Sequence, residues 1–331
     1  MTILLITHSR DNEAPQRVAR ALQARGARPY RFDTDLFPTR VQLSLDEAGG
    51  GRLSGPEGVL DLADVTALWY RRNAIGRDIP QDLDPQLRAP SVEESRRVVL
   101  GLMAALGVFQ LDAMEHLRRA EHKPLQLRLA RALGMDVPRT LMTNDAEAVR
   151  AFAARCPGGV ITKMMSSFAV YDEQGREQVV FTTPLDAGQL EDLSGLDLCP
   201  MTFQERLVKA LELRVTVVGD RVMAAAIDSQ ALPGAREDWR REGVALLGAW
   251  KPYTLPETLK AQVLRLMDAL GINYGAFDFV VTPEGRHVFL EVNPAGEFMW
   301  LLSTPGLPID EALADVLSGR APRRLGPMSG G

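Results

Sequence analysis

Three side chains that can supply oxygen ligands lie in the apolar stretch from residue 275 to residue 300. Asp278 belongs to a run of β-branched and aromatic residues, and a Pro-Glu-Gly turn at 283–285 separates it from a second apolar run. This pattern predicts a β-hairpin. Glu291 and Asn293 are two residues apart in the second arm, so both side chains leave the same face of the strand. Two carboxylates and a carboxamide are hard oxygen ligands, which suit an Mg²⁺ ion that also holds substrate phosphates.

An ordinary hairpin with solvent-facing acids is the alternative interpretation, because aspartate is usually exposed. The very apolar surroundings of Asp278 and Glu291 argue against that alternative, as does Pro294, which fixes a chain reversal directly after Asn293.

Two lysines earlier in the chain lie where an anion is expected. Lys123 precedes Pro124, and since proline favours the first turn of a helix, the helical pattern over 114–133 is expected to begin anew at or just after Lys123. The helix dipole disfavours a cation there unless an anion is bound. Lys163 lies in an apolar strand over 159–164, where lysine is rarely found for packing. For each lysine alone, a solvated surface charge is the alternative.

The hydrophobic pattern predicts the elements that position these residues. An opening β-α-β unit, an antiparallel meander and a further strand over 65–70 come first, followed by a surface loop over 76–90 and a helix over 91–106. Arg71 and Arg72 directly follow the strand over 65–70, at a strand end where α/β folds place ligand contacts. A solvated charge pair is weighed equally for these two arginines. Later elements are helices over 145–155, 186–196, 256–270 and 309–317, strands over 138–142, 201–207, 213–218 and 221–227, and a hairpin of 168–172 with 177–182.

Composition excludes several classes of protein. The chain has 331 residues, 46% of them hydrophobic, and a formal net charge of −5, so it can bury a sizeable core but lacks the excess of cations that nucleic-acid binding requires. Cys156 and Cys199 stand in unrelated contexts, which suggests neither a disulfide framework nor a zinc site. No run is long and apolar enough for a membrane helix, and no signal peptide is recognised, so a cytoplasmic location is expected.

The ordered set of charged and amide residues resembles that of the ATP-grasp ligases. The set consists of Lys123, Lys163, Glu205, Glu212, Asp278, Glu291 and Asn293. The resemblance implies an α/β fold with a Rossmann-like pre-ATP-grasp lobe at 1–113, a central lobe at 114–205 and a C-terminal ATP-grasp lobe at 206–331.

The same resemblance implies roles in ATP binding. Glu205 aligns with the acid of the linker strand, Arg206 offers a backbone C=O and Val208 a backbone N–H to the adenine, and Glu212 takes the ribose hydroxyls. Lys123 and Lys163 hold phosphate oxygens, and the hydroxylated loop at Ser166 and Ser167 is assigned to the same site. Asp278, Glu291 and Asn293 are assigned to two Mg²⁺ ions.

Within the ATP-grasp ligases, three motifs resemble peptide-modifying enzymes, and above all the graspetide macrocyclases of the microviridin type. The motifs are WYRR at 69–72, LELRVTVVGD at 211–220 and NPAGEFMW at 293–300. The ribosomal S6 modification enzymes are more distantly similar. The resemblance implies phosphorylation of Asp or Glu side chains in a ribosomally made precursor peptide, and their attack by Thr or Ser hydroxyls or Lys amines of the same peptide.

Arg214 and Arg240 are the cations expected at the carboxylate that is activated, because arginine binds a carboxylate bidentately. A leader segment of the precursor is expected near the acidic helix that carries Asp186, Glu191 and Asp192, although a solvated acidic face is the simpler interpretation for each acid. Two alternative functions are a ligase that joins a free amino acid to a peptide or protein terminus, and a catalytically inactive module that only binds a peptide. The sequence leaves open whether the bond is an ester or an amide, and whether the chain forms a homodimer.

Overall fold

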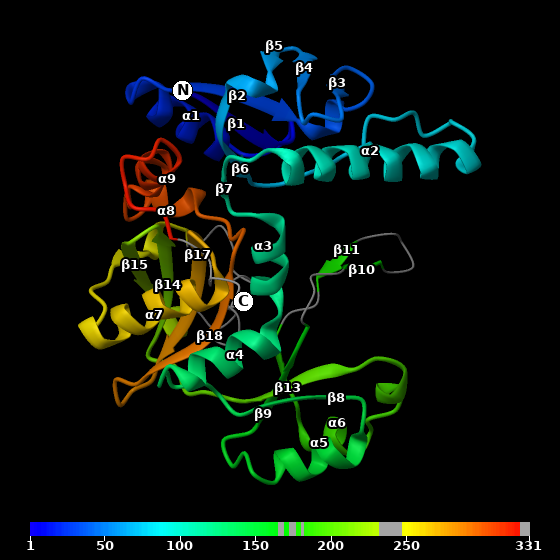
Figure 1. Ribbon diagram of the computed structural model, residues 1–331. Helices are drawn as coiled ribbons and strands as arrows, with labels where there is room; N and C mark the ends of the chain where they lie inside the picture. Colours follow the sequence, from blue (N-terminus) through cyan, green and yellow to red (C-terminus); the bar gives the residue numbers. More distant parts are fainter. Residues whose placement is uncertain (165–168, 172–176, 180–181, 232–246, 325–331) are drawn as a thin grey trace, which may run out of the picture.

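The structure is a computed structural model, and it describes residues 1–164, 169–171, 177–179, 182–231 and 247–324. Three sheets follow one another along the long dimension of the molecule (Figure 1): the N-terminal sheet at the top, the sheet of β14, β15, β17 and β18 in the middle, and the sheet of β8, β9 and β13 at the bottom. None of the described helices is long and apolar enough to cross a membrane.

The N-terminal sheet is parallel, with strand order β2-β1-β6-β7. Its strands are β1 (Thr2–Thr7), β2 (Arg28–Asp33), β6 (Val65–Tyr70) and β7 (Phe109–Leu111). Alternate residues of β1 face opposite layers, as the strand period requires. Ile3 and Leu5 pack with α1 (Ala14–Ala24), whereas Leu4 and Ile6 pack with α2 (Pro85–Ala105). The predicted meander is confirmed as β3 (Gln42–Leu45), β4 (Gly51–Gly55) and β5 (Gly58–Asp61).

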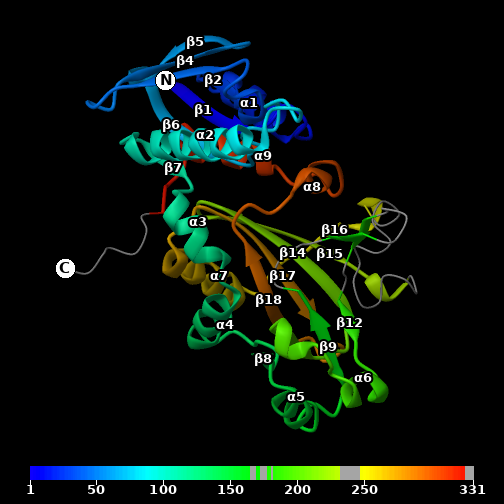
Figure 2. The same ribbon diagram turned by 90° about the vertical axis from the view of Figure 1, so that its right-hand side faces the viewer.

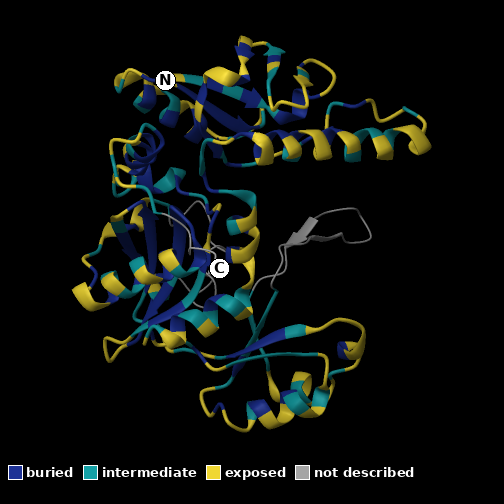
Figure 3. Cartoon of the chain, in the orientation of Figure 1, coloured by how far each residue is buried: buried dark blue, intermediate teal, exposed yellow. Residues whose placement is uncertain are grey.

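Helix α2 begins six residues earlier than the sequence pattern predicted, so the expectation of a loop as far as residue 90 was wrong. The Asp84 carboxylate accepts a hydrogen bond from the Gln86 N–H at 2.8 Å, and Pro85 occupies the first helical position, where its missing N–H costs nothing. Pro90 lies near the helix start and does not end it. The outer surface of α2 is largely exposed (Figure 3).

The middle sheet is antiparallel, with strand order β16-β15-β14-β17-β18. Its strands are β14 (Leu211–Val218), β15 (Arg221–Ile227), β16 (Lys251–Pro252), β17 (Tyr274–Val281) and β18 (His287–Asn293). One face packs on α7 (Glu257–Leu270) through Phe277, Phe279 and Phe289. The chain then forms α8 (Met299–Ser303), which the sequence pattern missed, and α9 (Ile309–Leu317), which packs on α1 of the N-terminal lobe.

Two short helices cover the edge of the middle sheet. The break at Lys123-Pro124 is confirmed, since α3 (Met114–Glu121) ends there and α4 (Lys123–Ala132) begins. Both helices contact β18 and α7. The buried Gln126 amide pairs with the backbone of Val292 in β18 through two hydrogen bonds, of 2.8 and 3.0 Å. The first turn of α4 is thereby fixed against the strand that carries Glu291.

The third sheet is antiparallel, with strand order β12-β9-β13-β8. Figure 2 shows β12, β9 and β8 at the lower end of the molecule. Its strands are β8 (Thr140–Thr143), β9 (Val160–Lys163), β12 (Thr183–Pro184) and β13 (Met201–Glu205), and its helices are α5 (Ala146–Ala153) and α6 (Ala187–Glu191). A small core joins Val149 and Phe152 of α5 to Val160 and Phe203 of the sheet. The predicted hairpin beyond β9 is confirmed as β10 (Ala169–Tyr171) paired with β11 (Glu177–Val179).

Candidate functional site

The predicted β-hairpin is confirmed, and its register brings the three side chains predicted as oxygen ligands onto one face. Asp278 of β17 lies directly opposite Glu291 of β18, and Ala276 lies opposite Asn293. Directly opposed residues share a face, as do residues two apart in one strand. The phenylalanines at 277 and 279 face the helical core on the other side. Two carboxylates and a carboxamide therefore project together, and this oxygen donor set fits Mg²⁺. Within the described residues no group of three His, Cys, Asp or Glu side chains that could hold a metal ion is found, and the metal role of Asp278, Glu291 and Asn293 stays a prediction.

Each carboxylate of the hairpin is paired with a predicted functional cation. The Arg214 guanidinium donates to Asp278 at 2.8 Å, across the β14–β17 register. Lys123 lies 3.0 Å from Glu291, from the first position of α4. Burial alone would raise the pKa of Glu291, but Lys123 and Lys163 hold that pKa below its ordinary value. The Glu291 carboxylate is therefore ionised at neutral pH.

The guanidinium group of Arg214 is held by both of its terminal nitrogens and lies beside an aromatic ring. Its side chain is 10% exposed, its second terminal nitrogen donates to the Glu297 carbonyl at 3.0 Å, and its guanidinium lies 5.4 Å from the centre of the Trp300 ring. Gly296 allows this approach, because a Cβ there would lie 2.5 Å from the Ala276 Cβ and 3.1 Å from the guanidinium. Although burial would lower the pKa of Arg214, the Asp278 carboxylate keeps it above its ordinary value, so a permanent cation stands beside the ligand face.

Glu297 ties this site to the N-terminal lobe, and the sequence reasoning missed it. One carboxylate oxygen accepts hydrogen bonds from the N–H groups of residues 298 and 299, and the other accepts from Arg71 at 2.8 Å and Arg72 at 2.7 Å. Arg71 also donates to Asp11 at 2.7 Å, and its side chain is 3% exposed. Arg71 thus joins Asp11, near the start of the chain, to Glu297, and its predicted substrate contact stays a prediction. Arg72 is 39% exposed, and its predicted substrate contact stays a prediction.

The residues assigned to adenine and ribose lie in and beside the segment that connects β13 to β14. Glu205 ends β13, Glu212 is the second residue of β14, and Val208 between them is 72% exposed. The Glu212 carboxylate lies 3.1 Å from the Lys209 ammonium, a neighbour that spacing alone did not reveal. The Glu205 carboxylate accepts a hydrogen bond from the Arg139 N–H at 2.9 Å. The nucleotide contacts of these residues, and of Arg206, stay predictions.

Three other assigned residues, Ser166, Ser167 and Arg240, lie outside the described residues. The acids assigned to the leader are all exposed at one end of the third sheet. Asp186 caps α6 by accepting from the Gln189 N–H at 2.8 Å, and Asp192 accepts from the Ser194 N–H at 3.1 Å. Asp186 and Asp192 each accept a backbone hydrogen bond and remain exposed, as does Glu191, so the leader contacts of all three acids stay predictions.

The whole chain was compared with known proteins. Residues 2–118 match a family described as the MvdD pre-ATP grasp domain. The macrocyclase MdnC from Microcystis aeruginosa MRC, bound with the precursor peptide MdnA, is 44% identical, covers 96% of this chain and 100% of its own, and gives a TM-score of 0.88. A Chryseobacterium gregarium RiPP-associated ATP-grasp ligase, in complex with ADP and a leader and core peptide, is 36% identical over 98% of both chains, with a TM-score of 0.94.

The ATP-grasp ligase PsnB, complexed with a phosphomimetic variant of its minimal precursor, Mg and ADP, is 26% identical over 96% of this chain and 98% of its own, with a TM-score of 0.74. No curated protein sequence matches. The α/β ATP-grasp fold and the macrocyclase resemblance inferred from the sequence are confirmed by these similarities. The chain belongs to the family of RiPP-associated ATP-grasp ligases that includes the macrocyclase MdnC.

Proposed function

We propose that this enzyme uses ATP and Mg²⁺ to close rings within a ribosomally made precursor peptide. The γ-phosphoryl group of ATP is transferred to an Asp or Glu side chain of the peptide, which gives an acyl phosphate and ADP. A Thr or Ser hydroxyl, or a Lys amine, of the same peptide then attacks the acyl carbon and loses its proton, and phosphate leaves. The product is an ester or an amide. The observation that carries this proposal is the shared face of Asp278, Glu291 and Arg214.

This face suits acyl-phosphate chemistry because it combines metal ligands with fixed cations. Mg²⁺, when bound, neutralises charge on the phosphate oxygens during transfer. Asp278, Glu291 and Asn293 would hold two such ions. Lys123 and Lys163, which now balance Glu291, would bind phosphate oxygens. Positioning and electrostatic stabilisation are then the protein's main contribution.

Arg214 is proposed as the cation that meets the substrate carboxylate. It cannot swing freely, since Asp278 and the Glu297 carbonyl hold both terminal nitrogens. A carboxylate brought to the ligand face therefore meets a charge whose position is already set, which lowers the reorganisation needed in the transition state. Arg240 is proposed as a second such cation, and Asp186, Glu191 and Asp192 as leader contacts.

The product mass tests this proposal. The precursor is sought as a short reading frame beside this one, with a C-terminal part rich in Thr or Ser and in Asp or Glu. With ATP and Mg²⁺, ring closure should lower its mass by about 18 Da, one water, for each bond formed, with no free amino acid required. Mild base should reverse the change for esters and leave amides intact. Mass gains that depend on an added amino acid would contradict the proposal.

A further inference from the structure

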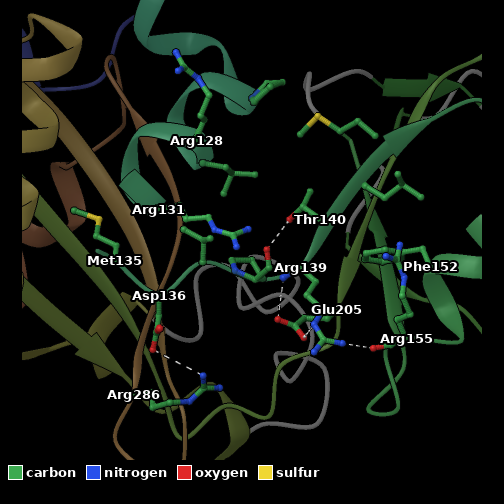
Figure 4. A pocket seen from close by; sticks show the side chains of 16 residues that line it. Arg128, Arg131, Met135, Asp136, Arg139, Thr140, Phe152, Arg155, Glu205 and Arg286 are labelled. Carbon is green, nitrogen blue, oxygen red and sulfur yellow. Dashed lines mark hydrogen bonds and ion pairs between the residues drawn. The ribbon is translucent and has the colours of Figure 1, made fainter. Parts of the chain in front are cut away.

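A groove of about 1340 Å³ lies between α4 and β8, apart from the ligand face (Figure 4). Helix α4 belongs to the same packed layer as α7, which covers the face of the middle sheet opposite to Asp278 and Glu291. The groove is lined from that layer by Leu127, Arg128 and Arg131. It is therefore distinct from the face that carries Asp278 and Glu291, and Glu205, assigned above to the nucleotide, also lines it.

The rim of this groove is basic although the chain carries a net charge of −5. Five arginines line it against two carboxylates, Asp136 and Glu205. Arg286 lies 3.8 Å from Asp136, and the backbone N–H of Arg139 donates to Glu205. Among the described residues, no carboxylate lies within ion-pair distance of Arg128 or Arg131, the two arginines on α4. Arg131 extends from α4 toward Thr140 on the other wall (Figure 4).

The opposite wall is an edge strand. β8 is the last strand of its sheet and pairs only with β13 among the described strands. An edge strand directs the N–H and C=O groups of alternate residues away from its sheet, where another extended chain can pair with them. Apolar side chains of Leu127, Leu141 and Met142 also line the groove. Backbone partners, an apolar lining and arginines in one groove match an extended peptide that alternates acidic and apolar side chains.

We propose that this groove binds an extended acidic segment of the precursor peptide, which adds as a strand to β8 and places carboxylates on Arg128 and Arg131. The identity of the peptide rests on the proposed function. Lys123, at the start of α4, contacts the ligand hairpin, and Arg131 follows eight residues later, about 12 Å along the helix. About four extended residues span that length, so a precursor of ordinary length reaches both surfaces.

Ring closure should weaken the binding of the peptide in this groove. Each ring closure converts one peptide carboxylate into a neutral ester or amide. A segment held by arginine–carboxylate pairs then loses one attractive charge for each ring, so the groove retains unmodified peptide and releases the finished product. The affinity of the groove should accordingly follow the number of free carboxylates in the segment.

The experiment measures binding of a fluorescein-labelled ten-residue peptide of alternating Glu and Val to the full chain, by fluorescence anisotropy without ATP. The matched probe has Gln in place of every Glu. The test variant is Arg128→Gln/Arg131→Gln, and the control is Arg118→Gln/Arg119→Gln, which removes two equally exposed arginines from α3, outside the groove. Thermal melts show that both variants are folded.

The test variant should bind the Glu peptide about five- to thirtyfold more weakly, the effect of losing two partly exposed charge pairs. The control variant should change affinity less than about twofold, and the Gln probe should bind the wild type no better than it binds the test variant. N-methylation of alternate residues of the Glu peptide should weaken binding through loss of backbone pairing. Equal losses in both variants, or binding that ignores N-methylation, would overturn the proposal. The mass assay for ring closure is independent of this binding assay, so failure of the groove and failure of the proposed function give different results.

Discussion

The ion pairs of Arg71 and Arg72 allow a paired test of how burial sets the strength of an interaction. Both guanidinium groups contact the same two carboxylates, Asp11 and Glu297. The Arg71 side chain is 3% exposed and that of Asp11 is 0% exposed, whereas the Arg72 side chain is 39% exposed. Arg71 also lies 5.7 Å from the Trp69 ring centre and 5.2 Å from that of Phe298.

Replacing Arg71 with Met should destabilise the contact between the lobes by about 3–5 kcal/mol, because Asp11 stays buried with its main partner removed. Replacing Arg72 with Met should cost about 1 kcal/mol or less, since water screens that pair. Arg71→Lys should fall between the two, because lysine keeps the charge but cannot donate to both carboxylates in a fixed plane.

Hydrogen exchange measured by mass spectrometry suits this comparison, because a chain of this size can open in parts rather than all at once. Peptides that cover β1 and β6 should exchange about 10²- to 10⁴-fold faster in Arg71→Met and less than about tenfold faster in Arg72→Met. Peptides from β8 and β13, in the third sheet, serve as the internal control. Equal acceleration in the two variants would refute the argument from burial.

Three further predictions concern the site and its surroundings. Glu291→Gln should lower ring formation at least about a hundredfold, as loss of a fixed electrostatic contact does, with little change in the thermal melt; a near-wild-type rate would contradict the metal assignment. Lys163→Ala should weaken ATP binding measured by calorimetry, because Lys163 meets the phosphates of bound ATP before reaction. Arg214→Ala should retain ATP affinity and suppress the reaction, because Arg214 meets the carboxylate that is being activated. An equal loss of ATP affinity in both variants would refute this division of roles. Burial raises the pKa of Asp112 from 3.8 to about 6 although three N–H groups of residues 273 and 274 donate to it. Between these two pH values, Asp112 is therefore protonated in the folded state and ionised in the unfolded state. Its contribution to stability should therefore grow by about 1–3 kcal/mol as pH falls from 7 to 4 and disappear as pH rises through 6; unfolding of wild type and Asp112→Asn at both pH values checks the sign, and parallel pH profiles would contradict it.

Much of the ligand hairpin could be predicted because its determinants are local. The two-residue period of a strand places Glu291 and Asn293 on one face whatever surrounds them. The turn at 283–285 does not by itself bring Asp278 opposite Glu291, because the pairing that starts at Val281 and His287 shifts register between Asp278 and Phe279. The helix start at Lys123 is equally local, since Pro124 fixes it. Helix α2 shows the limit of local signals. Its first turns contain two prolines, which usually indicate that a helix is interrupted. Here the helix forms nevertheless, with a capping hydrogen bond from the Gln86 N–H to the Asp84 carboxylate.

The sequence by itself determined which residues are candidates for binding metal and phosphate and, through its motifs, the family. Only the tertiary structure decided which cation meets which carboxylate. Arg214 pairs with Asp278 because β14 lies beside β17 in one register, and Lys123 meets Glu291 because Gln126 holds α4 against β18. The partners of Glu297 come from the other end of the chain. Such contacts depend on how separate layers pack, and packing follows from the shapes of whole buried surfaces rather than from any short pattern of residues.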